Sequence, residues 1–592
     1  MNTVEPESPA YATISPDTTF SENPFAGSPS AIRIGDGTLE PLKRKQKRNK
    51  PTLSCEECVE RKTKCDRGRP NCLACIKRQA ECKYAYVANI LEETGRISGT
   101  ARRVTKPPKR NLSLSNGFDG PKHAPVPDER SASRGSTSSS IGLLSHVPYS
   151  HPTASNVFGI GSEHPFANYW TCQGGLPETI SVLPDKIQAD ILLERYFECV
   201  DPVYPMIHRQ TFYADYEHLW GLPQPEKDRT DGALIAMLFA MLAIGTQFVT
   251  TSPPKERQQT AEFYVSAAHQ SLRMSSYLSK ASVRSIQAMV LITYFLINDN
   301  HASDGWAFAG ILIRQAYAMG LHRDPNIVCP TASPFDKQLR RKLWQAVLLQ
   351  DTFLTVLLSL PPSATHTDVS VADLIDDESS IASSDPTDTA YMRGSWTLAN
   401  LVQETICSPR SLDLPICSTP RQKTKLLVDF KSVYRSFPDI FRSWTPASLT
   451  NLAIAAPRVV RQTLFLTSNY FHNVMLLHSS FSPEVPINSR GALEAAHDAI
   501  AAFFLLYLFF ESEAKVWWVF NHRAFLECLC IGGILRDELK EEGGEETVLR
   551  DQLFIRGKED LVRMIEIMQQ MSEGEHGSAV AATRVEVLRA YI

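Results

Sequence analysis

The chain has 592 residues, of which 43% are hydrophobic and 21% are charged, and its formal net charge is −4. This length and composition are typical of a soluble protein of several domains with a large buried core. The small net charge hides an asymmetry, because residues 43–83 hold 14 Lys/Arg against 5 Asp/Glu and the remainder carries −13. A compact basic block on an acidic body indicates a polyanion-binding module.

The sequence predicts neither secretion nor a membrane span. Residues 1–17 lack the charged and apolar regions of a secretory signal. The longest apolar runs, Ala233–Gly245 and Ala499–Phe510, are about a dozen residues each, whereas a span needs about 20. We expect core helices, no membrane partner and an intracellular, reducing compartment, where clustered cysteines are metal ligands or catalysts more often than disulfides.

The amino-terminal part divides into an acidic tail and a basic arm. Residues 1–42 are rich in Ser, Pro, Thr and acidic residues without a sustained period, which predicts a disordered tail. Such a tail can contact the transcription machinery, but a merely solvated tail is the favoured interpretation. A basic run follows and is interpreted as a nuclear localisation signal or a phosphate-contacting arm, with a plain solvated run as the alternative. Its residues are Lys43, Arg44, Lys45, Lys47, Arg48 and Lys50.

Six cysteines come next in the pattern C-x2-C-x6-C-x6-C-x2-C-x6-C, which is one spacing written twice. They are Cys55, Cys58, Cys65, Cys72, Cys75 and Cys82. Each zinc thiolate site needs four ligands, so six sulfurs serve two zinc ions only if two of them bridge both metals. A segment of about 30 residues cannot bury enough apolar surface to fold alone, so metal binding would supply its folding free energy. A purely structural zinc knuckle is the alternative.

This segment resembles the Zn2Cys6 binuclear zinc-cluster domain of fungal transcription factors. The resemblance rests on all six cysteines, the basic residues between the second and third, and the loop residue Pro70. It implies two zinc ions per chain, bridged by Cys55 and Cys72. One ion would also take Cys58 and Cys65. The other would also take Cys75 and Cys82.

The resemblance also implies how DNA is read. In the family, the end of the helix after the second cysteine enters the major groove and reads a CGG-type triplet. Lys62 occupies the position of the main base-reading lysine and Arg61 that of its basic neighbour; basic side chains suit the O6 and N7 acceptors of guanine. Glu60 departs from the family pattern, since many members carry a basic residue near there. Phosphate contacts, which set register without reading sequence, are expected from Lys64, Lys77 and Arg78.

The remaining chain predicts a linker and a large helical body. We assign residues 43–90 to the basic arm and DNA-binding domain, 91–180 to a flexible linker and 181–592 to the body. The only candidate coiled coil, Tyr86–Ile97, is too short to sustain a dimer. Expected caps are Asp185, Ser282 and Ser303. Apolar residues recur at helical spacing over 190–198, 231–248, 261–278, 283–297, 306–319, 335–358, 422–437, 457–477, 492–510, 516–535 and 558–571, with a polar gap at 373–388.

The fold class is therefore all-α, with a small cluster domain and a large helical domain. Between about 183 and 360 the body resembles the fungal-specific transcription factor regulatory domain, or middle homology region, although Leu360-Pro361-Pro362 replaces the usual Gly-Arg-Pro. In the family this domain is thought to restrain activating segments, sometimes in response to a small molecule. The phrases that carry the likeness begin at Tyr196-Phe197, Pro202-Val203-Tyr204-Pro205, Trp306-Ala307-Phe308, Gly320-Leu321-His322-Arg323-Asp324 and Arg340-Arg341-Lys342-Leu343-Trp344.

The body offers no catalytic constellation. His322-Arg323-Asp324 imitates a kinase catalytic loop, but Pro325 follows it and no Gly-rich loop precedes it. Three polar residues within apolar helices are candidates to line a ligand pocket, although satisfied core polar groups are the favoured interpretation. They are Asn298, His301 and His472.

Together these features predict a nuclear, zinc-dependent, sequence-specific regulator of RNA polymerase II transcription that is not an enzyme. The expected partners are double-stranded DNA and the transcription machinery, with a homodimer and a small-molecule effector as further candidates. We expect an activator of metabolic or secondary-metabolite genes, with a repressor as an alternative. A zinc-cluster scaffold or ligand-sensing protein that acts through protein contacts is the other alternative.

Overall fold

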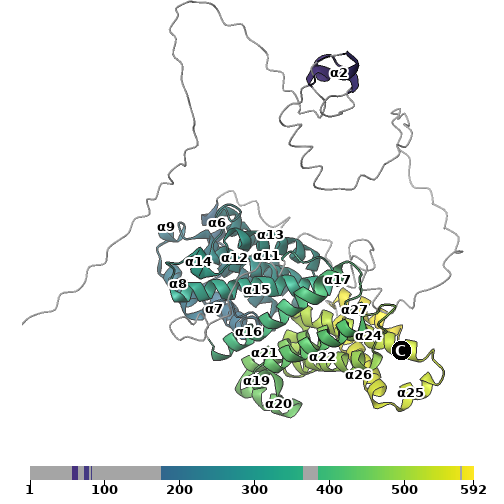
Figure 1. Cartoon of the computed structure of the whole chain (residues 1–592). Coiled ribbons are helices and arrows are strands. Elements are labelled where there is room, and N and C mark those ends of the chain that lie inside the picture. Colours follow the sequence, from purple (N-terminus) through teal and green to yellow (C-terminus); the bar gives the residue numbers. More distant parts are fainter. Residues whose placement is uncertain are drawn as a thin grey trace, which may run out of the picture. The chain divides into compact units, whose positions relative to one another are not determined.

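The computed structural model describes residues 56–64, 73–78, 80, 82, 175–364, 385–573 and 577–592. The chain divides into two units, residues 1–130 and 131–592, and each is described by itself (Figure 1). Within the described residues the secondary structure is helical, and the only β-type pairing is an isolated bridge between Ser482 and Val485. The predicted all-α fold class is confirmed.

The described residues of the first unit form two short helices, α1 (Glu56–Glu60) and α2 (Leu73–Arg78). The two helices pack against each other. Among the described residues of this unit, Cys58 and Cys75 are the fully buried ones, with Ala74 and Cys82 packed against them. A segment of about 30 residues with a core built around cysteines gains little from apolar burial to offset the conformational entropy that folding costs.

The second unit is a helical body whose first group of helices gathers at one end (Figure 1). These helices are α6 (Leu176–Ile180), α7 (Lys186–Arg195), η2 (Tyr196–Val200), α8 (Arg209–Gly221), α9 (Gln224–Lys227), α10 (Gly232–Gln247), α11 (Pro254–Met274), α12 (Val283–Asn298), α13 (Ala302–Ala318), α14 (Pro325–Val328) and α15 (Pro334–Leu358). Every residue of α10 is buried, and this helix packs against α7, α11 and α12. A Cβ atom at Gly245 would lie 2.2 Å from the Leu192 carbonyl oxygen, so only glycine allows α7 to cross α10 so closely.

The second group of helices completes the body at its other end (Figure 1). It contains α16 (Pro386–Val402), η4 (Gln403–Cys407), α17 (Ser408–Ser411), α18 (Pro420–Ser436), α19 (Asp439–Arg442), α20 (Pro446–Ala455), α21 (Pro457–Ser479), α22 (Ser489–Phe509), α23 (Glu511–Val516), α24 (Trp518–Glu538), α25 (Gly544–Arg550), α26 (Gln552–Ser572) and α27 (Ala579–Arg589). Helix α21 packs along α22 and also contacts α24. The two groups meet where α15 contacts α16 and where α12 contacts α24.

Helix α22 is long and apolar enough to cross a membrane by length and composition alone. However, 56% of its most apolar stretch is buried inside the body, where it packs against α21, α24 and α26. That environment is typical of a core helix, which is what the sequence predicts for the run within it.

A buried ion network joins the two groups of helices. Arg458, at the start of α21, donates to Asp388 of α16 at 2.7 Å and to Asp201 at 2.8 Å. The side chains of Asp388 and Asp201 are 2% and 3% exposed. Buried charges persist when they are paired and hydrogen-bonded, so the arginine compensates both carboxylates at once.

The predicted helix starts are partly correct. Asp185 accepts a hydrogen bond from the Gln188 amide and caps α7, and Ser282 forms a capping box at the start of α12. Ser303 is not a cap, because α13 begins one residue earlier and His301 occupies the cap position. Ser303 instead lies buried in the first turn.

Candidate nucleic-acid interface and metal centre

The two short helices of the first unit end in the same way. The Thr63 amide donates to the Cys58 carbonyl at 2.9 Å, and the Ala80 amide donates to the Cys75 carbonyl at 3.1 Å. Each is a bond from residue i to residue i−5, the type that closes a helix end around a left-handed residue. The doubled cysteine spacing therefore produces a doubled turn.

Lys62 is the left-handed residue of the first turn, with φ of 53°. A side chain in that region costs about 1 kcal/mol relative to glycine, so the turn and not the residue's own preference sets its conformation. Its side chain is exposed at the end of α1. This is the residue that the sequence predicts to read a base.

The described cysteines fit a thiolate metal centre. Cys58 and Cys75 are 1% and 0% exposed, and Cys82 is partly buried against them. Within the described residues no group of three or more possible ligands lies close enough to hold a metal ion. The buried cysteines supply the thiolate donors that tetrahedral zinc favours. Cys55, Cys65 and Cys72 lie outside the described residues, as does the basic arm Lys43–Lys50.

The predicted DNA-contacting residues near the ends of α1 and α2 are exposed, but one of them, Arg61, is also ion-paired. Lys64 and Lys77 are exposed. Arg61 is also exposed, but its Nε forms an ion pair with Glu57, one turn earlier on α1. This pairing was missed although the i, i+4 spacing of a glutamate and an arginine is a visible helix pattern. Glu60, which departs from the family pattern, is exposed.

Arg78 has a different environment from the one expected for a phosphate contact. Its Nε donates to the Ala74 carbonyl at 2.9 Å. Its Nη2 donates to Thr63 Oγ1 at 3.1 Å and lies 3.7 Å from Cys58 Sγ. One edge of the guanidinium is therefore occupied inside the module.

Comparisons with known proteins match the chain in two places. Residues 53–87 match the fungal Zn(2)-Cys(6) binuclear cluster domain. Residues 193–434 match the fungal specific transcription factor domain. The chain carries both domains of the fungal Zn(2)-Cys(6) transcription factors. The zinc cluster thus contains the doubled turn, and the regulatory domain runs from α7 to α18.

The curated relatives described next are also named as transcription factors or transcriptional regulators, and each is compared with this chain. It is 29% identical to the Zn(2)-C6 fungal-type transcription factor mpsB of Macrophomina phaseolina over 191 residues, 31% of this chain and 25% of mpsB. It is 26% identical to the equisetin cluster transcription factor eqxF of Fusarium heterosporum over 203 residues, 32% of this chain and 28% of eqxF. The match to the uncharacterized transcriptional regulatory protein C139.03 of Schizosaccharomyces pombe is longer, with 24% identity over 63% of this chain and 59% of that protein.

The matched part thus spans about a quarter of the length of mpsB and of eqxF. Both domains and these relatives indicate a transcription factor and not an enzyme.

The kinase-like phrase of the regulatory domain is structural. Asp324 caps α14 by accepting from the Asn326 amide at 3.0 Å, and it pairs with buried Arg341 at 3.5 Å. The His322 ring packs between Tyr317 and Trp344, with ring centroids 4.8 Å and 6.0 Å away. These groups hold the junction of α13, α14 and α15 together.

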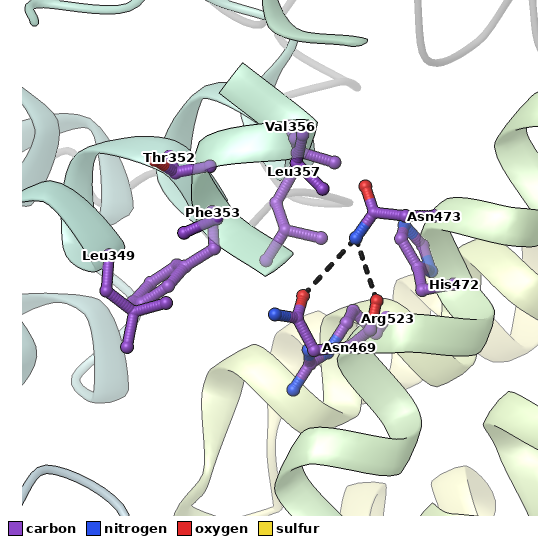
Figure 2. A pocket seen from close by; sticks show the side chains of 11 residues that line it. Leu349, Thr352, Phe353, Val356, Leu357, Asn469, His472, Asn473 and Arg523 are labelled. Atoms are coloured by element: carbon purple, nitrogen blue, oxygen red, sulfur yellow. Dashed lines mark hydrogen bonds between the residues drawn. The ribbon is translucent and has the colours of Figure 1, made fainter. Parts of the chain in front are cut away.

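The three polar residues predicted as a pocket lining do not share a cavity. His472 lines a cavity of about 10 Å³ between α15, α16, α21 and α24, with Asn469, Asn473 and Arg523 around it (Figure 2). A volume of this size holds about one water molecule. Asn298 lines a separate cavity of about 140 Å³ beside Trp518 and Asn521. His301 lines neither of these two cavities.

His301 and His472 both lie against carboxylates. His301 Nδ1 lies 3.3 Å from Asp304 at the start of α13. His472 Nδ1 lies 3.0 Å from Glu527 Oε1, and both side chains are buried. Burial lowers the pKa of His472 and raises the pKa of Glu527, so both shifts favour a neutral, hydrogen-bonded pair. His472 Nε2 and Glu527 Oε2 are nevertheless buried without a hydrogen-bond partner, so the predicted satisfied core polar group is only half realised here.

Proposed function

We propose that this chain is a nuclear, sequence-specific DNA-binding regulator of RNA polymerase II transcription that depends on two zinc ions. The observation that carries the proposal is the turn after α1. It places an exposed lysine, Lys62, four residues beyond a buried cysteine in a module that matches the zinc-cluster domain. The proposed domains remain 43–90 for DNA binding, 91–180 for the linker and 181–592 for regulation.

Zinc would be held by the six cysteine sulfurs, with Cys55 and Cys72 shared between the two ions. When bound, zinc supplies the folding free energy that the small core lacks. Lys62 and Arg61 would donate to the O6 and N7 acceptors of guanine in a CGG-type triplet, and Lys64 and Lys77 would bind phosphates. To bind a base, Arg61 must either break its ion pair with Glu57 or bind Glu57 and the base with different N–H groups.

Several finer assignments belong to the same proposal. The basic arm 43–50 would serve nuclear import. An activator of a metabolic or secondary-metabolite gene set is the favoured role, and a relative named as the equisetin cluster transcription factor, eqxF, supports it. If two protomers assemble, the linker would set the spacing of their half-sites.

Selection from a random duplex pool with the full-length, zinc-loaded protein tests the function. Enrichment of a defined GC-rich triplet is the expected result, and its absence favours the zinc-cluster scaffold that acts through protein contacts. Zinc analysis of the same preparation should give two ions per chain. A content of one or none contradicts the binuclear centre.

The role of Lys62 is tested best with alanine. Lys62→Ala removes the charged side chain and leaves the backbone cost of φ 53° as it is in the wild type, whereas Lys62→Gly would also relieve that cost. We expect Lys62→Ala to cost about 1–3 kcal/mol on the selected triplet and to relax the preference there. If it weakens every sequence equally, Lys62 is a phosphate contact and another residue reads the base.

A further inference from the structure

Arg78 links the two halves of the zinc-cluster module through a single side chain. From the end of α2 its guanidinium reaches back to the Ala74 carbonyl and across to Thr63 Oγ1 and Cys58 Sγ. Both of the last two residues belong to the first half of the module. This polar contact adds to the packing of Cys58 against Cys75 between the same two helices.

The residue that Arg78 contacts is the one that closes the turn around Lys62. Thr63 follows Lys62 directly, and its amide donates to the Cys58 carbonyl. Arg78 therefore touches both ends of that turn: the Thr63 side chain at one end and the Cys58 side chain at the other. A left-handed lysine has no intrinsic reason to stay in that conformation, so external support of the turn matters.

The chemistry of the contact suits arginine and not lysine. The guanidinium is a planar fork, and its Nε and Nη2 hydrogens point along one edge. Here that edge serves a carbonyl, a hydroxyl and a sulfur together. If Cys58 is a zinc thiolate, the N–H to sulfur contact becomes charge-assisted and stronger. A lysine ammonium is a point charge at the end of a flexible stem and cannot occupy all three positions.

We propose that Arg78 is a positioning residue for base recognition and not a phosphate ligand. It ties α2 to the end of α1 and thereby fixes the backbone from which Lys62 reads the triplet. This inference rests on the proposed function and deepens it, because it assigns sequence specificity to a residue that does not touch the base.

The test compares four variants of the full-length, zinc-loaded protein: Arg78→Gln, Arg78→Lys, Thr63→Val and, as a matched control, Lys77→Gln. Lys77 is the exposed neighbour of Arg78 on the same helix. Binding is measured over a range of salt on a duplex with the selected triplet and on a scrambled duplex of the same composition. Each variant is first checked for its zinc content.

A positioning role predicts that Arg78→Gln and Arg78→Lys both reduce the preference for the triplet by about fivefold or more and leave the salt slope unchanged. Thr63→Val, which alters no charge, should do the same, and combining it with Arg78→Gln should add little. Lys77→Gln should instead weaken both duplexes equally and lower the salt slope by about 0.9.

The proposal is overturned if Arg78→Gln behaves like Lys77→Gln and Arg78→Lys restores binding, because lysine also binds phosphate. Hydrogen exchange at the Thr63 amide gives a second readout that needs no DNA. The exchange rate should be higher in Arg78→Gln and Thr63→Val than in the wild type and in Lys77→Gln. An unchanged rate in the first two variants would also contradict the proposal that Arg78 holds this turn. A wild type without any triplet preference would reject the proposed function alone, and Thr63 exchange would still decide whether Arg78 holds the turn. If Arg78→Gln loses zinc, Arg78→Lys and Thr63→Val carry the comparison.

Discussion

The two units of this chain are stabilised by different means. In the described part of the zinc-cluster module only Cys58 and Cys75 are fully buried, whereas the helical body has a continuous apolar core that runs from α6 to α27. Apolar burial stabilises by about 25 cal/mol per Å², so it can account for the second unit but not for the first. On the proposed function, the zinc-cluster module would therefore need metal to fold, while the helical body would persist without it.

Removing zinc should give the largest difference in stability between the two units. Structural zinc contributes about 10–16 kcal/mol to small metal-built domains, so a strong chelator should unfold the module and abolish triplet binding. The helical body should keep its far-ultraviolet circular dichroism and its thermal midpoint. A large fall of that midpoint in chelator would show that the regulatory domain also needs metal.

Breaking the ion network should have the opposite effect, on the body alone. Arg458→Met leaves Asp201 and Asp388 buried without their shared cation, and removal of one partner of a buried pair costs about 3–5 kcal/mol. Urea unfolding of the body measures this loss, and zinc content should stay unchanged. The matched control is Arg490→Met, whose exposed pair with Asp551 should matter little. Equal losses for the two variants would contradict a special role for the buried network.

The sequence predicts most of the long helices, but it predicts neither most of the short ones nor this network. Apolar periodicity is a local property, and it locates α10, α12, α15 and α21 to within a few residues. Helix α16 falls partly in the predicted polar gap, because its acidic start is stabilised by tertiary partners. Arg458 and Asp201 are 257 positions apart, and no local pattern relates them.

The zinc-cluster module shows the same division between local and spatial information. Cysteine spacing predicts a metal centre, and the resemblance to the family implies that Lys62 reads a base; both stay predictions. The partners of Arg61 and Arg78 required the structure. A basic side chain can equally face phosphate, pair along its helix, or cross to another helix, and composition does not distinguish these outcomes.

The pH dependence of the body offers a smaller test of the network. Burial raises the pKa of Asp201 to about 6, while Arg458 acts to lower it. The folded state therefore holds this proton more tightly than the unfolded chain, and stability present below about pH 4 is lost as the pH rises to about 6. Asp201→Asn should remove about 2 kcal/mol of that dependence between pH 4.5 and 7.5. Unfolding free energies at pH 4.5 and 7.5 measure it, and an unchanged difference would place the titration elsewhere.

The smallest predicted effect concerns the ion pair between Glu57 and Arg61 on the zinc-cluster module. If Arg61 binds DNA as proposed, Glu57 would compete with the DNA for it. An exposed ion pair is worth about 0–1 kcal/mol, so Glu57→Gln should tighten binding by up to about fivefold at low salt, and the gain should shrink as salt screens it. Glu60→Gln is the control. It removes the same charge three residues further along α1 but leaves the ion pair between Arg61 and Glu57 intact. If both variants gain equally, the effect is one of net charge alone. A larger gain for Glu57→Gln, greatest on the selected triplet, would mean that Arg61 leaves its helix partner to meet the base.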